Sequence, residues 1–200
     1  MAHRSLAPLL LVSLSTLAAN AQPGQMRATI HLHHDDPDSI IQIGETVTWT
    51  LSIAFQNAAA AEGGNLKLIA SDNLGFASEM TFTPTNGGFN ADTPQGPHLP
   101  FINWTNSLLL DAFGHPANRA NPFTVGSFQF TATGQGTFTY DVLKGWASAP
   151  FLTLANSPLD RTNFDQGQPD LDIDSLAIVP SPAPAALLAA GILLVWCRRR

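Results

Sequence analysis

The sequence predicts an all-β domain, a two-sheet antiparallel β-sandwich. Apolar and polar residues alternate with a period of two along several stretches, as they do in strands with one buried face. Turn-forming residues recur about every eight to twelve positions over a span of about 160 residues, which is typical of sandwiches and jelly rolls. The same span has no long amphipathic helical pattern. These features favour two packed sheets.

Two strands show the alternation most clearly. Their inward residues are Met26, Ala28, Ile30 and Leu32 in the first, and Val47, Trp49, Leu51 and Ile53 in the second. Further strands are expected at residues 65–70, 76–83, 125–132, 137–142 and 171–178. Residues 134–136, Gly-Gln-Gly, predict a hairpin between the strands on either side of them.

Three other stretches of the body are less regular. In the last strand the apolar residues change parity after residue 173, which predicts a bulge near Asp174 and Ser175. The four alanines at 58–61 predict one helical turn. The segment between residues 83 and 125 is rich in Asn, Gly and Pro and contains an apolar island at 101–110. It is either a loop packed on the sandwich or another strand pair.

Residues 1–21 have the parts of a secretory signal peptide. Arg4 precedes a Leu-rich apolar stretch at 6–18, and Ala19 and Ala21 are small residues at the third-last and last positions. We expect cleavage before Gln22 and export of the chain.

Residues 179–200 have three parts in a fixed order. A Pro-rich stem at 179–184 precedes an apolar run at 185–197, and the segment ends with Arg198, Arg199 and Arg200. The run gives about 20 Å of helix, which is short for a stable membrane span. The arginines favour a cytoplasmic C-terminus. The expected organisation is a signal peptide at 1–21, a sandwich at 22–178 and a C-terminal signal at 179–200.

This C-terminal order resembles the PEP-CTERM protein-sorting signal, found on exported proteins of Gram-negative bacteria that make exopolysaccharide. The motif residues are Val179, Pro180, Ser181 and Pro182, with Ser181 where the family most often has Glu. The resemblance implies recognition by exosortase, a membrane-embedded enzyme that removes the helix and releases the protein or transfers it to a surface acceptor. An ordinary short membrane anchor is the alternative.

The body between the two signals is acidic and has no cysteine. It has five Lys and Arg against all fifteen Asp and Glu, a net charge of −10 with His neutral. Such a surface repels phosphate, which argues against nucleic acid as a partner. The single cysteine, Cys197, lies in the apolar tail, so a hydrophobic core must hold the body without disulfides.

Two stretches of the body resemble strands of cohesin-like and carbohydrate-binding-module sandwiches. The first is residues 44–46, Gly-Glu-Thr, followed by the strand at 47–53. The second is the strand at 126–132 leading into 136–140. The resemblance implies a cohesin-like or Ig-like/jelly-roll topology.

Histidines and acids after the first strand are candidate metal ligands: His31, His33, His34, Asp35 and Asp36. His31 and His33 share the outer face of a strand and could chelate one ion. However, His33 and His34 point in opposite directions, and the sequence supplies no third well-spaced ligand. A solvated strand face is therefore favoured.

A second group, Asp170, Asp172 and Asp174, would line one face of a regular strand. Three carboxylates within reach suit Ca²⁺, which prefers oxygen ligands. No glycine-centred calcium loop surrounds them, and acids on an exposed strand also prevent edge-to-edge aggregation. We expect an exposed strand face here as well, and no metal or cofactor.

Two tryptophans are candidates for ligand binding. Trp104 and Trp146 lie near loop signals and could form a stacking platform for sugar rings, although core packing is the favoured alternative. Trp49 is expected in the core. The sequence has no Gly-x-Ser-x-Gly elbow, zinc-protease helix or phosphate-binding loop, so we assign no catalytic residue.

We therefore expect a non-enzymatic, exported protein of the cell surface or extracellular matrix, processed by an exosortase through its C-terminal signal. The C-terminal helix would hold it transiently in the inner membrane before it reaches the surface or the medium. One alternative is a carbohydrate-binding module that holds exopolysaccharide. A further alternative is a secreted hydrolase.

Overall fold

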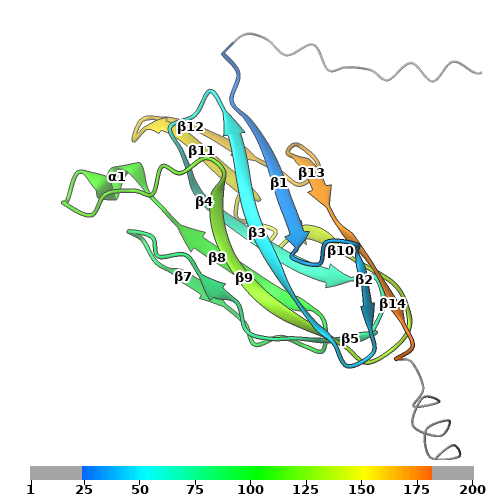
Figure 1. The fold of residues 1–200 in the computed structure, drawn as a ribbon. Coiled ribbons are helices and arrows are strands. Elements are labelled where there is room, and N and C mark those ends of the chain that lie inside the picture. Colours follow the sequence, from blue (N-terminus) through cyan, green and yellow to red (C-terminus); the bar gives the residue numbers. More distant parts are fainter. Residues whose placement is uncertain (1–23, 182–200) are drawn as a thin grey trace, which may run out of the picture.

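The computed structural model describes residues 24–181, which form two packed β-sheets and one short helix, α1 (Leu108–Asp111) (Figure 1). The predicted all-β class with two sheets is confirmed. The residues of the predicted signal-peptide cleavage site, Ala19, Ala21 and Gln22, lie outside the described residues, as do Pro182 and the arginines 198–200 of the predicted C-terminal signal. Within residues 24–181, no helix is long and apolar enough to cross a membrane.

The first sheet has six strands in the order β13-β1-β3-β9-β5, with β6 also pairing with β9. These strands are β1 (Arg27–His34), β3 (Thr46–Gln56), β5 (Gly75–Ala77), β6 (Thr81–Phe82), β9 (Phe123–Ala132) and β13 (Asp170–Ile173).

The second sheet has eight strands, and β12-β11-β4-β10-β14-β2 is its main order. Its strands are β2 (Ile40–Gln42), β4 (Ala60–Ala70), β7 (Phe89–Ala91), β8 (Leu99–Thr105), β10 (Gly136–Lys144), β11 (Leu152–Ser157), β12 (Asp160–Phe164) and β14 (Ser175–Val179). β8 pairs with β4, and β7 pairs with β8.

Most strand pairs are antiparallel, but two are parallel: β1 with β13, and β14 with β2. The prediction of a wholly antiparallel sandwich is therefore wrong at these two pairs. Both involve strands near the end of the described chain that join strands near its start after a long connection, and such connections permit parallel pairing.

The core lies between the two sheets and follows the predicted alternation. Ile30, Leu32, Trp49 and Leu51 are fully buried, as their parity in β1 and β3 predicts. Aromatic rings fill the space between the sheets. Phe130 of β9 and Phe138 of β10 stack with their ring centroids 4.1 Å apart, a contact that joins the two layers.

The predicted hairpin at residues 134–136 is wrong. β9 belongs to the first sheet and β10 to the second, so the chain crosses between layers at this turn. Gly136 has φ +148°, and the Gly134 amide donates to the Leu74 carbonyl at 3.0 Å. The crossing lets the apolar faces of both strands meet in the core, whereas a hairpin would place the strands side by side in one sheet.

The predicted strand at 171–178 is two strands in different sheets. β13 pairs with β1 in the first sheet, and β14 pairs with β10 and β2 in the second. Asp174 lies at the crossing, and its amide donates to the Leu32 carbonyl at 3.0 Å. The parity change therefore marks a change of sheet and not a bulge within one strand.

Other segments differ in detail from the expectations. Ala60 and Ala61 begin β4 and are buried, so the predicted helical turn at 58–61 is wrong. The segment 83–125 contains the β7–β8 pair, which confirms the strand-pair alternative, followed by α1. Strands β2, β11 and β12 were not predicted from the sequence.

Candidate functional site

A polar groove of about 400 Å³ lies on the second sheet, along β4, β8, β11 and β12. Its lining combines amide and hydroxyl side chains with one ion pair and two glycines of β4: Glu62, Gly63, Gly64, Asn65, Asn103, Thr105, Ser107, Ala149, Pro150, Thr153, Arg161 and Asn163. Within the sheet, Asn65 lies opposite Asn103 and Gly63 lies opposite Thr105. The groove therefore rests on regular strand pairing, which fixes the spacing of its side chains.

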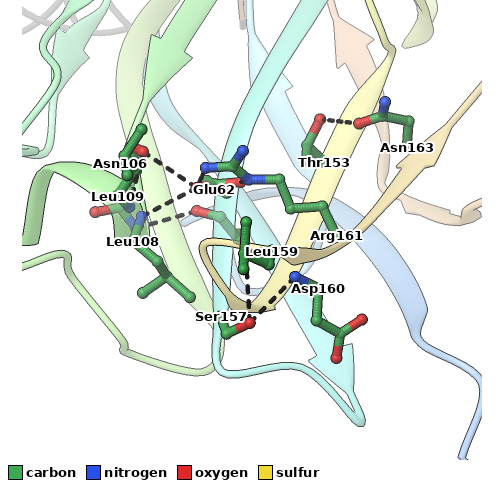
Figure 2. A network of polar contacts seen from close by, with 12 residues as sticks. Glu62, Asn106, Leu108, Leu109, Thr153, Ser157, Leu159, Asp160, Arg161 and Asn163 are labelled. Carbon is green, nitrogen blue, oxygen red and sulfur yellow. Dashed lines mark hydrogen bonds and ion pairs between the residues drawn. The ribbon is translucent and has the colours of Figure 1, made fainter.

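At one end of the groove, Glu62 and Arg161 form an ion pair (Figure 2). Glu62 is only 5% exposed, and its Oε2 lies 2.5 Å from the Arg161 Nε. Its Oε1 accepts from the Arg161 Nη2 at 2.9 Å and from the Leu108 amide at 3.0 Å. Because the buried carboxylate has a cation and several donors, its burial is compensated.

The wall beside this ion pair is held by Asn106, which is fully buried. Its Nδ2 donates to the carbonyls of Ala61 at 3.0 Å and Asn118 at 2.6 Å, and its Oδ1 accepts from the Asn118 amide at 2.7 Å. These bonds tie the segment containing α1 to β4. The wall of the groove is therefore fixed by buried hydrogen bonds.

Trp146 is not part of the groove lining, but it contacts Asn65, which is. Its backbone amide donates to the Asn65 Oδ1, and its ring stacks on Phe101 with centroids 4.6 Å apart and planes at 25°. Phe101 is 5% exposed, whereas Trp146 is 57% exposed. An aromatic ring supported on one side and open to solvent can accept a flat apolar ligand face.

Asn65 links the groove to the Trp146 loop. It is 2% exposed, and its Nδ2 is buried with no partner among the described residues. The Gly145 amide donates to the Asn65 carbonyl at 3.1 Å, and a Cβ on Gly145 would lie 2.5 Å from the Asn65 Oδ1. Only glycine allows this close approach of the loop.

Trp104, the other candidate for sugar stacking, lies in the core. It is 2% exposed, and its ring packs so closely over Gly64 that a Cβ there would overlap it. A ligand therefore cannot reach the Trp104 ring, and Trp146 is the remaining candidate for stacking on a sugar.

Candidate metal ligands from the two groups predicted in the sequence lie side by side on the first sheet. His31 and His33 of β1 lie next to Asp172 of β13, because these strands pair in parallel with His31 opposite Asp172. The His31 Nδ1 lies 2.9 Å and the His33 Nε2 3.1 Å from the same Asp172 Oδ2. The hydrogen bond from His31, with a smaller contribution from the charge of His33, lowers the pKa of Asp172. The structure thus brings a third side chain of a metal-ligating type beside the two histidines, which the sequence did not show.

The remaining residues of these two groups have other partners. The amide of His34 donates to the Asp174 Oδ2 at 3.1 Å. Asp35 accepts from the Thr48 amide at 2.9 Å, and Asp36 accepts from the Ile40 amide at 3.1 Å. These carboxylates hold the backbone where β1 ends. Asp170 is exposed on β13, and Asp174 lies where the chain changes sheet, so the three aspartates do not share one regular strand face.

Three residues of the predicted sorting motif lie within the described chain. Val179 is the last residue of β14, and its carbonyl accepts from the Ile43 amide at 3.0 Å. Pro180 and Ser181 are exposed, and the Ser181 hydroxyl donates to the Ile43 carbonyl at 2.6 Å. The Pro-rich stem therefore starts directly at the edge of the sandwich.

The sequence reasoning missed Glu62, Arg161, Asn65 and Asn106. Glu62 follows a run of alanines and precedes two glycines, and Arg161 lies in a short polar segment. Neither stretch has a motif that predicts an ion pair. The two residues meet only because β11 brings β4 and β12 into one sheet.

No protein-family model and no curated protein matches the chain. Solved structures with a similar fold include cohesin modules. One is the seventh ScaB type I cohesin from Pseudobacteroides cellulosolvens, with a TM-score of 0.54 and 8% identity, covering 78% of this chain and 94% of that one. Another is the second type II cohesin module of the ScaA scaffoldin from Acetivibrio cellulolyticus, with a TM-score of 0.52 and 11% identity, covering 80% and 95%.

A third is a chain from a type I cohesin–dockerin complex of Clostridium thermocellum, with a TM-score of 0.52 and 10% identity, covering 76% of this chain and 99% of that one. At such identities the likeness concerns the fold alone. The described chain has a cohesin-like β-sandwich fold, which confirms the cohesin-like resemblance predicted from its strands.

Proposed function

We propose that this chain is an exported, non-catalytic binding protein of the cell surface or extracellular matrix. The observation that carries the proposal is the cohesin-like sandwich, which spans nearly the full length of its solved neighbours. One of these neighbours comes from a complex with a dockerin, which is a protein partner. By analogy of fold, the sandwich binds a partner through a preformed surface.

The proposal includes sorting through the C-terminal signal. Residues 179–200 combine the Pro-rich stem, the short apolar run and the terminal arginines in the order of a PEP-CTERM signal. An exosortase-type enzyme would act on the stem, of which Pro180 and Ser181 are exposed directly after the last strand. Processing there would leave the sandwich intact, because its last strand ends at Val179.

Fractionation of the native host tests export and sorting. We expect the wild-type chain in the surface or medium fraction. Substitution of Arg198, Arg199 and Arg200 by Gln removes the positive end that orients the helix, so this variant should lose normal sorting. Arg119→Gln, in the body, is the matched control and should be sorted normally. A wild-type chain in the cytoplasm, or unchanged sorting of the triple variant, would contradict the proposal.

A second candidate function, glycan binding, is favoured by the groove beside Trp146. The groove offers Asn, Thr and Ser side chains that can bond to sugar hydroxyls, and Trp146 offers an exposed ring for the apolar face of a sugar. A neutral or basic polysaccharide suits it best, because the body carries a net charge of −10.

Affinity electrophoresis of the protein in gels containing the host's exopolysaccharide tests this second function. We expect retardation that is lost in Trp146→Ala. Phe76→Ala is the matched control, since Phe76 is a similarly exposed aromatic (53%) on β5 of the other sheet. Equal retardation of both variants, or none of the wild type, would exclude glycan binding at this groove and leave the protein-partner function standing.

A further inference from the structure

Three side chains of the first sheet converge outside the groove, and nothing in the proposed function uses them. They are His31, His33 and Asp172, whose ligand atoms all lie within 4.8 Å of one another. They come from β1 and β13 and form the one such group of His, Cys, Asp or Glu among residues 24–181. We propose that this trio is a binding site for a divalent transition-metal ion, with Zn²⁺ as the best fit.

The two separations between a histidine nitrogen and the Asp172 Oδ2 are close to those that Zn²⁺ requires. Zn²⁺ binds His nitrogen and carboxylate oxygen at about 2.0–2.2 Å, which in a tetrahedral site separates neighbouring ligand atoms by about 3.3 Å. The two nitrogens lie 2.9 and 3.1 Å from the Asp172 Oδ2. Both N–O separations are within about 0.4 Å of that value, and the three ligand atoms all lie within 4.8 Å of one another, so a small movement of the side chains would place them around one ion.

The chemistry of the three ligands selects the class of ion. Two imidazoles and one carboxylate suit Zn²⁺, Ni²⁺, Cu²⁺ and Co²⁺, whereas Ca²⁺ and Mg²⁺ prefer a shell of oxygens. The side chains of His31, His33 and Asp172 are 24%, 45% and 56% exposed. Three protein ligands leave the fourth coordination position of the ion open, and the exposure of the site makes that position accessible to water.

The strand pairing holds the site in place before an ion arrives. His31 lies opposite Asp172, and His33 lies two residues further along the same face of β1. β1 is itself held on its other side by pairing with β3 along its whole length. In contrast, β13 is a four-residue edge strand, held on one side only. A bound ion would join this edge strand to the sheet by side-chain bonds.

Calorimetric titration with ZnCl₂ tests the proposal. The full-length chain, purified in detergent without a polyhistidine tag, should bind one Zn²⁺ with micromolar affinity, and CaCl₂ should give no saturable binding. Zn²⁺ at about a hundred times Kd should also raise Tm by about 5 °C or more. His33→Gln and Asp172→Asn should each weaken binding roughly tenfold or more.

The matched controls are the same kinds of substitution at a histidine and an aspartate outside the trio. His115→Gln changes an exposed histidine of a loop, and Asp170→Asn changes an exposed aspartate of the same edge strand. Both should bind Zn²⁺ as the wild type does. Circular dichroism without metal checks that each variant is folded, which is expected because His33 and Asp172 are both partly exposed. No saturable Zn²⁺ binding, or binding equally strong in folded His33→Gln, would overturn the proposal.

Discussion

Glu62 and Arg161 form an ion pair that spans a whole strand, because β11 lies between their strands β4 and β12. Glu62 is buried, and the side chain of Arg161 is 37% exposed. The pair closes one end of the polar groove and joins it to α1 through the Leu108 amide. Its role in holding the groove can be measured.

Arg161→Met keeps most of the aliphatic stem and removes the charge that compensates Glu62. We expect the free energy of unfolding to fall by about 2 kcal/mol, at the low end for a broken buried pair because Arg161 is partly exposed. Adding Glu62→Gln should restore part of the loss. The control is Arg119→Met, whose pair with Asp111 is more exposed and should cost less than about 1 kcal/mol. Equal costs in urea unfolding for Arg161→Met and Arg119→Met would contradict this role.

Gly64→Ala tests the packing beneath the groove. A Cβ at position 64 would overlap the ring of Trp104, so the core must shift, at a cost of about 1–3 kcal/mol. At Gly63 the nearest atom to a Cβ is the Trp104 carbonyl oxygen at 3.0 Å, and Gly63→Ala should cost less. Urea unfolding of both variants measures the two losses of stability, and the loss should be larger for Gly64→Ala. A Gly64→Ala variant as stable as the wild type would mean that Trp104 does not lie over this position.

Tyr140 should remain protonated for as long as the protein is folded. It is the single tyrosine of the chain, it is 2% exposed, and its hydroxyl donates to the Pro97 carbonyl at 3.0 Å. Burial raises the pKa of Tyr140 well above its ordinary value of 10.0. The unfolded chain loses this proton above about pH 10 while the folded chain keeps it, so stability falls as pH rises through this range.

Tyrosinate absorbance during an alkaline titration checks this prediction. Tyrosinate absorbance should be absent near pH 10 and should appear only when the circular dichroism spectrum of the folded protein is lost. The urea-unfolded chain is the control and should titrate near pH 10. Tyrosinate absorbance near pH 10 in protein that is still folded would show that Tyr140 is accessible.

The layer structure of the fold could be predicted from the sequence because each long strand has one buried face. Ile30, Leu32, Trp49 and Leu51 follow a period of two and are all buried. The sheet to which a strand belongs could not be predicted in the same way. The alternation in β9 and β10 is compatible with a hairpin or with a crossing between sheets, since both bury the same residues.

The sites depended on contacts between distant segments. His31 and Asp172 are 141 positions apart in the chain. In the sequence they belong to two separate groups of candidate metal ligands. Parallel pairing of β1 and β13 brings them together, and no local pattern predicts that pairing. Trp104 and Trp146 looked equivalent in sequence, but β8 directs Trp104 into the core whereas Trp146 follows the end of β10 in a loop.

The mass of the mature protein, isolated from its native host, tests the central claim of an exported and sorted binding protein most directly. Intact-mass spectrometry with terminal peptide mapping should find an N-terminus at Gln22 and a C-terminus near Pro182, just beyond the last strand. A mature pool that retains the signal peptide or ends at Arg200 would contradict the account.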